Sequence, residues 1–223
     1  MSTTATATSG PATGIAAVPA AVWEMNEARD ATTMTDASGN GRHGVIGDDV
    51  ITKAWTGDGR GYRWTHTSPT APPAKPERLV TVPDHPSLDP GAGIYSVSFR
   101  FQTTRKFGNY LQKGQAQTPG GQMKVQGPKG RVGCLFKGSK GRSATSSITP
   151  LNDGEWHVVT CRKDSQGVTM YVDGEFRNRN RRDPGFIDNN FPFTIGGKPK
   201  CDQVKVTCDY FVGKMDWVRI DAG

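Results

Sequence analysis

Amide and cationic side chains recur on short segments in which polar and apolar residues alternate. In 122–126, Met123 and Val125 suit a buried core, so the polar residues between them fall on the opposite face of a strand. Amides pair with sugar hydroxyls, cations pair with carboxylate or sulfate, and an aromatic ring stacks on a sugar ring. An ordinary solvated face of an antiparallel sheet has the same pattern. The candidate ligand-binding residues are Tyr110, Gln112, Lys113, Gln122, Lys124, Gln126, Lys137 and Arg162.

The distribution of charge favours an anionic ligand. The net charge is +7, and no Asp or Glu occurs between Asp89 and Asp153, a stretch that carries ten Lys and Arg residues. Acidic residues gather instead in 24–49, which contains six of them and two arginines. Segregation of this kind indicates a basic face for an anionic partner and an acidic pocket for a cation, although chance clustering on opposite sheet edges is the alternative. Arginines in 177–183 indicate an exposed basic loop or, alternatively, a phosphate- or sulfate-binding loop.

The same acid-free stretch argues against a glycoside hydrolase. Such enzymes use two carboxylates about 5–10 Å apart, and residues 90–152 contain none. No GxSxG motif accompanies the histidines, so a serine hydrolase is unsupported. A polysaccharide lyase needs no carboxylate, because Tyr or His can act as base and acid beside a uronate that polar groups neutralise. The candidate catalytic residues of a lyase are Tyr110, His66 and Gln112, within a wider polar set that includes Tyr62.

Four cysteines indicate an oxidising compartment. Four cysteines allow three pairings. Cys134 and Cys161 lie in two strand-like segments, and Cys201 and Cys208 close a short loop, so these two pairs are favoured over four buried thiols. Disulfides are typical of secreted proteins. The N-terminus has no signal-peptide pattern, and we expect a secreted protein in which a start methionine stands in place of the signal.

The elements that must position these residues are strands. Gly 28 and Pro 15 disfavour a helical bundle, no apolar run is long enough for a membrane helix, and no repeat of 20–50 residues is present. The Ala/Thr/Ser bias of residues 1–19 predicts a flexible leader, and 20–223 forms one domain. Short alternating runs separated by turn residues predict an all-β, two-sheet antiparallel sandwich of the jelly-roll type. The predicted strands are 21–25, 43–47, 61–66, 78–82, 94–102, 109–113, 122–126, 132–137, 155–163, 168–172, 192–195 and 210–220, with a turn at 85–89.

Four segments in the expected order resemble the laminin G-like branch of the concanavalin A-like lectin/glucanase superfamily. The most specific is 152–175, in which Gly-x-Trp-His-x-Val precedes a Tyr-Val-Asp-Gly hairpin. The others are an opening strand with Asp-x-Ser-Gly-Asn-Gly in 21–47, the Val-x-Val-Pro strand in 78–104, and PFTIGG at 192–197 followed by the run 210–220. The resemblance spans about 21–221 and implies a concanavalin A-like jelly roll.

The resemblance also implies a calcium ion and a binding function. Members of the family often hold one structural calcium near the opening turn and the last strand, and Asp36, Asn40 and Asp216 match those positions, with Glu27 as a possible addition. The alternative is that Asp36 and Asn40 only form turns. We expect a non-catalytic carbohydrate-binding module for an acidic polysaccharide. A polysaccharide lyase and a protein-binding adhesion module are the alternatives. We expect a monomer, with neither nucleic-acid binding nor membrane insertion.

Overall fold

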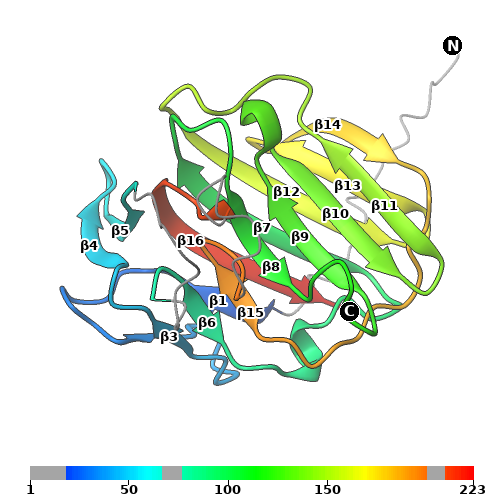
Figure 1. Cartoon of the computed structure of the whole chain (residues 1–223), viewed down its shortest axis with the longest axis horizontal. Helices are drawn as coiled ribbons and strands as arrows, with labels where there is room; N and C mark the ends of the chain where they lie inside the picture. The colour runs from blue at the N-terminus through cyan, green and yellow to red at the C-terminus, as the bar shows by residue number, and fades with distance from the viewer. Residues whose placement is uncertain (1–18, 67–76, 200–208) are drawn as a thin grey trace, which may run out of the picture.

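Alternating apolar residues arrange the strands in two antiparallel sheets that pack face to face, as the jelly-roll prediction requires (Figure 1). The computed structural model describes residues 19–66, 77–199 and 209–223. The predicted leader lies outside these residues except for Pro19, which is the first residue of a strand. Two short 3-10 turns, η1 (Pro86–Leu88) and η2 (Pro128–Gly130), interrupt the strands, and the first confirms the predicted turn. No helix in these ranges is long and apolar enough to cross a membrane.

Sheet A is organised around the C-terminal strand. Its strand order is β14-β13-β12-β7-β16-β5-β4, and β1 also pairs with β16. The dense apolar run near the C-terminus therefore forms a central strand, as its composition predicts. The strands are β1 (Pro19–Trp23), β4 (Ile51–Trp55), β5 (Arg60–Trp64), β7 (Tyr95–Gln102), β12 (Trp156–Asp164), β13 (Gly167–Val172), β14 (Glu175–Asn180) and β16 (Gly213–Ala222).

Sheet B carries most of the acid-free stretch. Its strand order is β11-β10-β9-β8-β15-β6-β3-β2. The strands are β2 (Thr33–Met34), β3 (Gly44–Ile46), β6 (Val80–Val82), β8 (Asn109–Lys113), β9 (Gln122–Gln126), β10 (Gly133–Gly138), β11 (Gly141–Ser146) and β15 (Phe193–Ile195). The predicted strands do not include β2, β4, β11 or β14, although the hairpin expected at Tyr-Val-Asp-Gly requires a second strand where β14 lies. The stretch 177–183, expected to be a basic loop, is partly strand, because β14 continues to Asn180.

The core lies between the inner faces of the two sheets. Alternate residues of β7 from Tyr95 to Phe101 are fully buried, as the alternation of apolar and polar residues in 94–102 requires. Trp23 of sheet A stacks on Phe193 of sheet B with ring centroids 5.5 Å apart. A disulfide joins Cys134 on β10 to Cys161 on β12 and so links the sheets covalently, confirming the first predicted pair. The predicted pair Cys201–Cys208 lies outside the described residues.

The hairpin between β13 and β14 forms where the sequence predicts it. Asp173 and Gly174 have φ of 53° and 81°, the positive values that a type I′ turn requires at both central positions. The turn returns β14 along the edge of sheet A. Asn178 and Asn180 then donate hydrogen bonds to the carbonyls of Ser146 and Ala144 on β11, so β14 also closes the sandwich edge against sheet B.

Candidate functional site

The outer face of sheet B carries the amide side chains that the sequence singles out. Met123 and Val125 of β9 are fully buried, and Gln122, Lys124 and Gln126 point to the other side, as the alternation predicts. Gln112 on β8 pairs in register with Lys124 and shares its face. These four residues, from two adjacent strands, are therefore brought together.

They line a cavity of about 450 Å³, which we call the glutamine pocket. The turn 115–117 after β8 contributes further amides, and the exposed ring of Phe107 lies at the pocket. These residues are not among the candidates that the sequence indicates, although the GQAQ run that follows Lys113 is itself amide-rich. The lining residues are Phe107, Gln112, Gln115, Ala116, Gln117, Gln122, Lys124, Gln126, Leu135, Lys198 and Asp209.

Hydrogen bonds to the backbone hold part of this pocket in place. Gln112 Nε2 donates to the carbonyl of Gly114 at 2.8 Å, and Gln122 Nε2 donates to the same carbonyl at 3.4 Å. Gln115 Nε2 is buried and has no hydrogen-bond partner within the described ranges. The pocket therefore combines fixed amides with a donor that a ligand hydroxyl or carboxylate could satisfy.

An ion pair forms another part of the pocket wall. Lys198 Nζ lies 2.8 Å from Asp209 Oδ2, and both side chains are buried. Asp209 Oδ1 has no partner among the residues the structure describes, so it could accept a hydrogen bond from a ligand. The sequence gives no sign of this pair, because only the fold places residues 198 and 209 beside β8 and β9.

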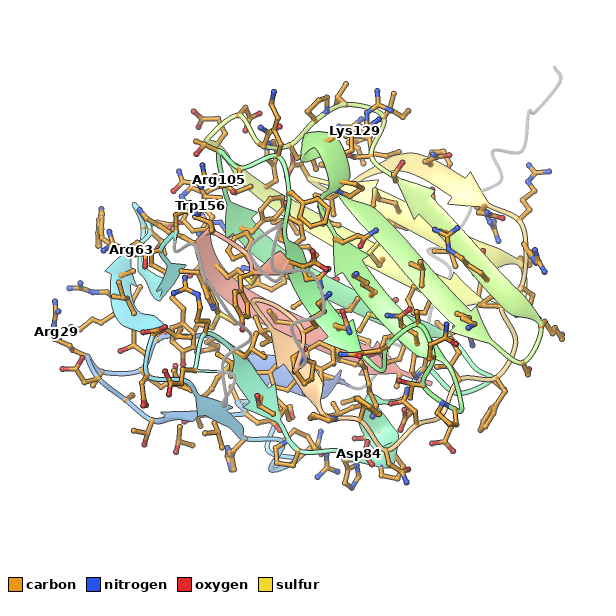
Figure 2. The ribbon with its side chains drawn as sticks, in the orientation of Figure 1. Arg29, Arg63, Asp84, Arg105, Lys129 and Trp156 are labelled. Atoms are coloured by element: carbon orange, nitrogen blue, oxygen red, sulfur yellow. A yellow bond between two sulfur atoms is a disulfide. The ribbon has the colours of Figure 1, made fainter. Side chains whose placement is uncertain are left out.

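A second cavity adjoins the glutamine pocket at Phe107. This basic pocket has a volume of about 480 Å³ and is lined by His66, Thr104, Arg105, Lys106, Phe107, Tyr210 and Val212. Arg105 and Lys106 are exposed and form no ion pair in the part of the chain that the structure describes. Figure 2 shows Arg105 at the periphery of the molecule. Unpaired cations beside an aromatic ring suit an anionic group on a ligand.

Tyr110 is not at this surface. A bulge between Asn109 and Leu111 breaks the alternation of β8, so the Tyr110 ring turns into the core, where it packs 4.8 Å from Phe101 and 5.0 Å from Phe211. Its exposed fraction is 2%, and burial raises the pKa of its hydroxyl far above the usual value. The prediction that Tyr110 stacks on a sugar therefore has no geometric basis.

The prediction that Lys113 binds a ligand at the surface is also wrong. It pairs with Met123 and points inward with it, and its side chain is fully buried. Its ammonium lies between Asp84 and Asp89, because the fold brings the connection after β6 beneath β8. Lys113 is therefore unable to meet a surface ligand.

The remaining two candidate residues, Lys137 and Arg162, lie on different sheets. Lys137 is exposed near the glutamine pocket, and its Nζ donates to the carbonyl of Ala116 at 2.7 Å, which braces the 115–117 turn. Arg162 lies on β12 in the other sheet, where its neighbours Cys161 and Lys163 point inward and it points outward, near Asp164. The structure thus separates Arg162 from the other candidates by the thickness of the sandwich.

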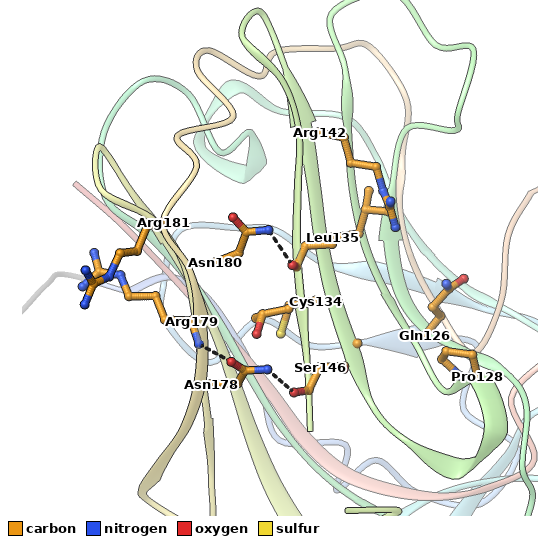
Figure 3. A pocket seen from close by; sticks show the side chains of 13 residues that line it. Gln126, Pro128, Cys134, Leu135, Arg142, Ser146, Asn178, Arg179, Asn180 and Arg181 are labelled. Carbon is orange, nitrogen blue, oxygen red and sulfur yellow. Dashed lines mark hydrogen bonds between the residues drawn. The ribbon is translucent and has the colours of Figure 1, made fainter. Parts of the chain in front are cut away.

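A third cavity, of about 520 Å³, lies where β11 meets β14 (Figure 3). Its lining includes Arg142, Arg179 and Arg181, but Figure 3 shows Arg179 and Arg181 pointing away from Arg142. Arg179 and Arg181 therefore do not form one anion site with Arg142.

The residues proposed for a lyase are not brought together. Tyr110 is in the core, Gln112 lines the glutamine pocket and His66 lines the basic pocket. A base must lie within hydrogen-bonding reach of the proton that it abstracts, directly or through one water. This geometry gives the lyase hypothesis no assembled catalytic set.

The carboxylates predicted to bind calcium have protein partners. Asp36 accepts hydrogen bonds from the backbone amides of Val22, Ser38 and Arg42 at 2.9–3.0 Å, and these outweigh the effect of burial and lower the pKa of its carboxyl. Asp216 is paired with Arg100.

Asn40 and Glu27 also have protein partners, although the contacts of Asn40 use its nitrogen and not the oxygen that would bind calcium. Asn40 Nδ2 donates to the carbonyl of Pro19, and Glu27 accepts from Tyr62 and from the backbone of Thr35. A calcium ion requires several oxygens that converge on one point, and no group of three or more His, Cys, Asp or Glu side chains that could hold a metal ion occurs in the described part of the chain. Calcium remains a prediction, which melting temperatures with added calcium and with chelator would test.

Comparison with known proteins identifies the family. A model of the concanavalin A-like lectin/glucanases superfamily, of laminin G type, matches residues 77–221. The chain belongs to this superfamily. No curated protein matches the chain.

Solved structures agree on the fold. Domain 4 of AbnA, a GH43 extracellular arabinanase from Geobacillus stearothermophilus solved with arabinotriose, is 19% identical, with a TM-score of 0.65 and coverage of 93% of both chains. The binding domain of Paraclostridial Mosquitocidal Protein 1 is 15% identical with a TM-score of 0.62, over 92% of this chain and 47% of that one. Domains LG4-5 of the mouse laminin alpha1 chain are 21% identical with a TM-score of 0.50, and the match covers 58% of this chain and 36% of the laminin chain. The match thus covers less than half the length of the laminin and toxin structures.

Proposed function

We propose that this domain is a non-catalytic carbohydrate-binding module and that the glutamine pocket binds an acidic polysaccharide. The observation that carries the proposal is the convergence of five glutamines with Phe107 on the outer face of sheet B. Amides both donate and accept hydrogen bonds, which matches the hydroxyls of a sugar ring. Phe107 offers an apolar ring surface on which a sugar can stack.

The charges around the pocket support an anionic polymer. Lys124 lies within the glutamine pocket, and Arg105 and Lys106 lie just beyond Phe107 in the basic pocket. The acid in the glutamine pocket, Asp209, is already paired with Lys198. A polymer that crosses Phe107 would therefore place its hydroxyls among the amides and its carboxylates or sulfates near cations.

The solved structures give independent support for a binding role. The arabinanase domain, which matches over nearly its whole length, is described as a complex with arabinotriose, a neutral oligosaccharide. An anionic ligand for this chain rests on its own charges and not on that similarity.

The test measures binding and cleavage together on alginate, pectate, hyaluronan and neutral arabinan. We expect binding to the acidic polymers, weakened by salt, with no rise in unsaturated-uronate absorbance. Lys124→Gln should weaken binding about tenfold, the value of one charge-assisted hydrogen bond. Arg162→Gln, which removes one cation from the opposite sheet, is the matched control and should leave the affinity unchanged.

Three other outcomes would contradict the proposed function or the proposed binding site. Equal losses in Lys124→Gln and Arg162→Gln would mean that overall charge, and not the pocket, drives binding. Release of unsaturated uronate would overturn the non-catalytic proposal in favour of a lyase. Absence of binding to every polymer, with retention of a protein partner, would favour an adhesion module.

A further inference from the structure

The buried ammonium of Lys113 is surrounded by oxygens from three segments of the chain. Its Nζ lies 2.5 Å from Asp84 Oδ1 and 3.2 Å from Asp89 Oδ1. The main-chain carbonyls of Asn189 and Phe191 lie at 2.9 and 2.8 Å. We call these four oxygens the oxygen cage. Lys113 itself is fully buried, so the cage is closed on the side of β8.

Contacts that do not involve the lysine hold the cage together. Asp89 Oδ1 accepts a hydrogen bond from the backbone amide of Asn189 at 3.1 Å, and Asn189 Oδ1 accepts from the amide of Phe191 at 3.0 Å. Asn189 Nδ2 donates to the carbonyl of Gly121 on the neighbouring turn. These bonds hold Asp89, Asn189 and Phe191 in place and should persist when the lysine is shortened. The contact described for Asp84 is with the lysine itself, so its carboxylate would have to be held by the ion that replaces the ammonium.

Two carboxylates and two main-chain carbonyls are the ligands that calcium prefers. Calcium takes about six to eight oxygens at roughly 2.3–2.6 Å. Asp84 Oδ1 already lies at such a distance from the centre of the cage, the two carbonyls would move inward by a few tenths of an ångström and Asp89 Oδ1 by more than about half an ångström, and waters would complete the shell. One ammonium leaves the two carboxylates with a net charge of −1, whereas Ca²⁺ would neutralise them. A shorter residue at position 113 would vacate the space for the ion and its waters.

We propose that Lys113 is a tethered cation that fills a calcium-type oxygen cage, and that shortening this lysine converts the cage into a Ca²⁺ site. The native side chain supplies the positive charge that a bound metal would otherwise provide, which holds the 84–89 connection and the 189–191 loop against β8. Figure 2 shows Asp84 and Arg105 at opposite rims of the molecule, so the cage is separate from the basic pocket.

The test compares the full-length chain with Lys113→Ala and Lys113→Met. Melting temperatures are measured in Ca²⁺, in Mg²⁺ and in chelator. For Lys113→Ala we expect Ca²⁺ to raise the melting temperature by roughly 5–10 °C at a concentration about 100-fold above its Kd, and Mg²⁺ to do less. Lys113→Met fills the space with an apolar chain and should respond to Ca²⁺ no more than the natural protein does. Adding Asp84→Ala to Lys113→Ala should remove the gain.

The comparison remains decisive if Lys113→Ala is unfolded without metal. Recovery of the β-sheet circular dichroism signal on addition of Ca²⁺, reversed by chelator, would support the proposal. A folded Lys113→Ala with no Ca²⁺ response beyond that of the natural protein would overturn it, as would a variant that stays unfolded in both Ca²⁺ and chelator. An equal Ca²⁺ response in Lys113→Met would also overturn it, because that change leaves no room in the cage.

Discussion

Lys113 and Lys163 hold the two ends of one connection from opposite sheets. Lys113 on β8 contacts Asp84 and Asp89, and Lys163 on β12 donates to the carbonyls of Gly91 and Gly93 at 2.8 and 3.1 Å. Both lysine side chains are fully buried. The connection between them carries the chain from β6 in sheet B to β7 in sheet A. Its polar groups would otherwise be buried without partners, so the two ammonium groups let it pass beside the core.

The disulfide also joins the sheets, and its removal should lower stability. Cys134 and Cys161 are 27 residues apart in sequence. Closing a loop of that length lowers the entropy of the unfolded chain, which stabilises the folded state by about 3–4 kcal/mol. We expect the double substitution Cys134→Ala/Cys161→Ala to lower the free energy of unfolding by about that amount in urea titration. A loss below about 1 kcal/mol would mean that the bond adds little to sheets already held by the core.

Phe107 should contribute to ligand binding without contributing much to stability. Its ring is 39% exposed and lies where the glutamine pocket and the basic pocket meet. Loss of a stacked ring typically costs about 1–2 kcal/mol, so Phe107→Ala should weaken polysaccharide binding by roughly 5–30-fold in calorimetric titration. Phe176→Ala, which removes another exposed ring from β14 in sheet A, is the control and should leave binding unchanged. Equal losses in the two variants would contradict the placement of the site.

Tyr110 should behave as a core residue. Tyr110→Phe keeps the ring packing against Phe99, Phe101 and Phe211, so we expect unchanged polysaccharide binding and a small change in stability. Tyr110→Ala opens a cavity and should lower the free energy of unfolding by about 3–5 kcal/mol. Selective loss of binding in Tyr110→Phe, with stability retained, would show that the hydroxyl reaches a ligand after all.

The parts of this fold that can be predicted from the sequence are those in which the local alternation of apolar and polar residues determines the strand and its buried face. The inward face of β7, the outward amides of β9 and the turn at Asp173 and Gly174 all follow from patterns within one or two strands. The family resemblance extends this to the sandwich itself. The buried face of β11 consists of the polar residues Ser143 and Thr145, so it shows no apolar alternation in the sequence. Most residues of β14 are exposed at the edge of sheet A, so its sequence carries no apolar pattern either.

The predictions of site residues are wrong where a single extra residue in a strand, or a long-range contact, determines the position of the side chain. The bulge after Asn109 turns Tyr110 into the core, and a regular alternation gives no sign of it. The oxygens that surround Lys113 come from segments more than 20 residues away on either side, so its burial is invisible in 109–113. Arg162 has the expected outward orientation but belongs to the other sheet, which only the strand order reveals.

The stability of the domain should fall as pH rises past neutrality because of His157. Its Nδ1 lies 2.9 Å from Asp173 Oδ2, and its Nε2 lies 3.2 Å from Asp153 Oδ1. Burial alone would lower the pKa of His157, but the two carboxylates outweigh it and raise the pKa above 6.5. The folded state therefore holds its proton more tightly than the unfolded chain does. This contribution is fully present below pH 6.5 and is lost as the pH rises through the folded pKa.

Urea titrations across this pH range would measure the effect. His157→Gln and Asp173→Asn should both flatten the fall in the free energy of unfolding, the second because the raised pKa depends on that carboxylate. His66→Gln, which changes an exposed histidine in the basic pocket, is the matched control and should keep the slope of the natural protein. A slope that survives in His157→Gln would assign the dependence to another group.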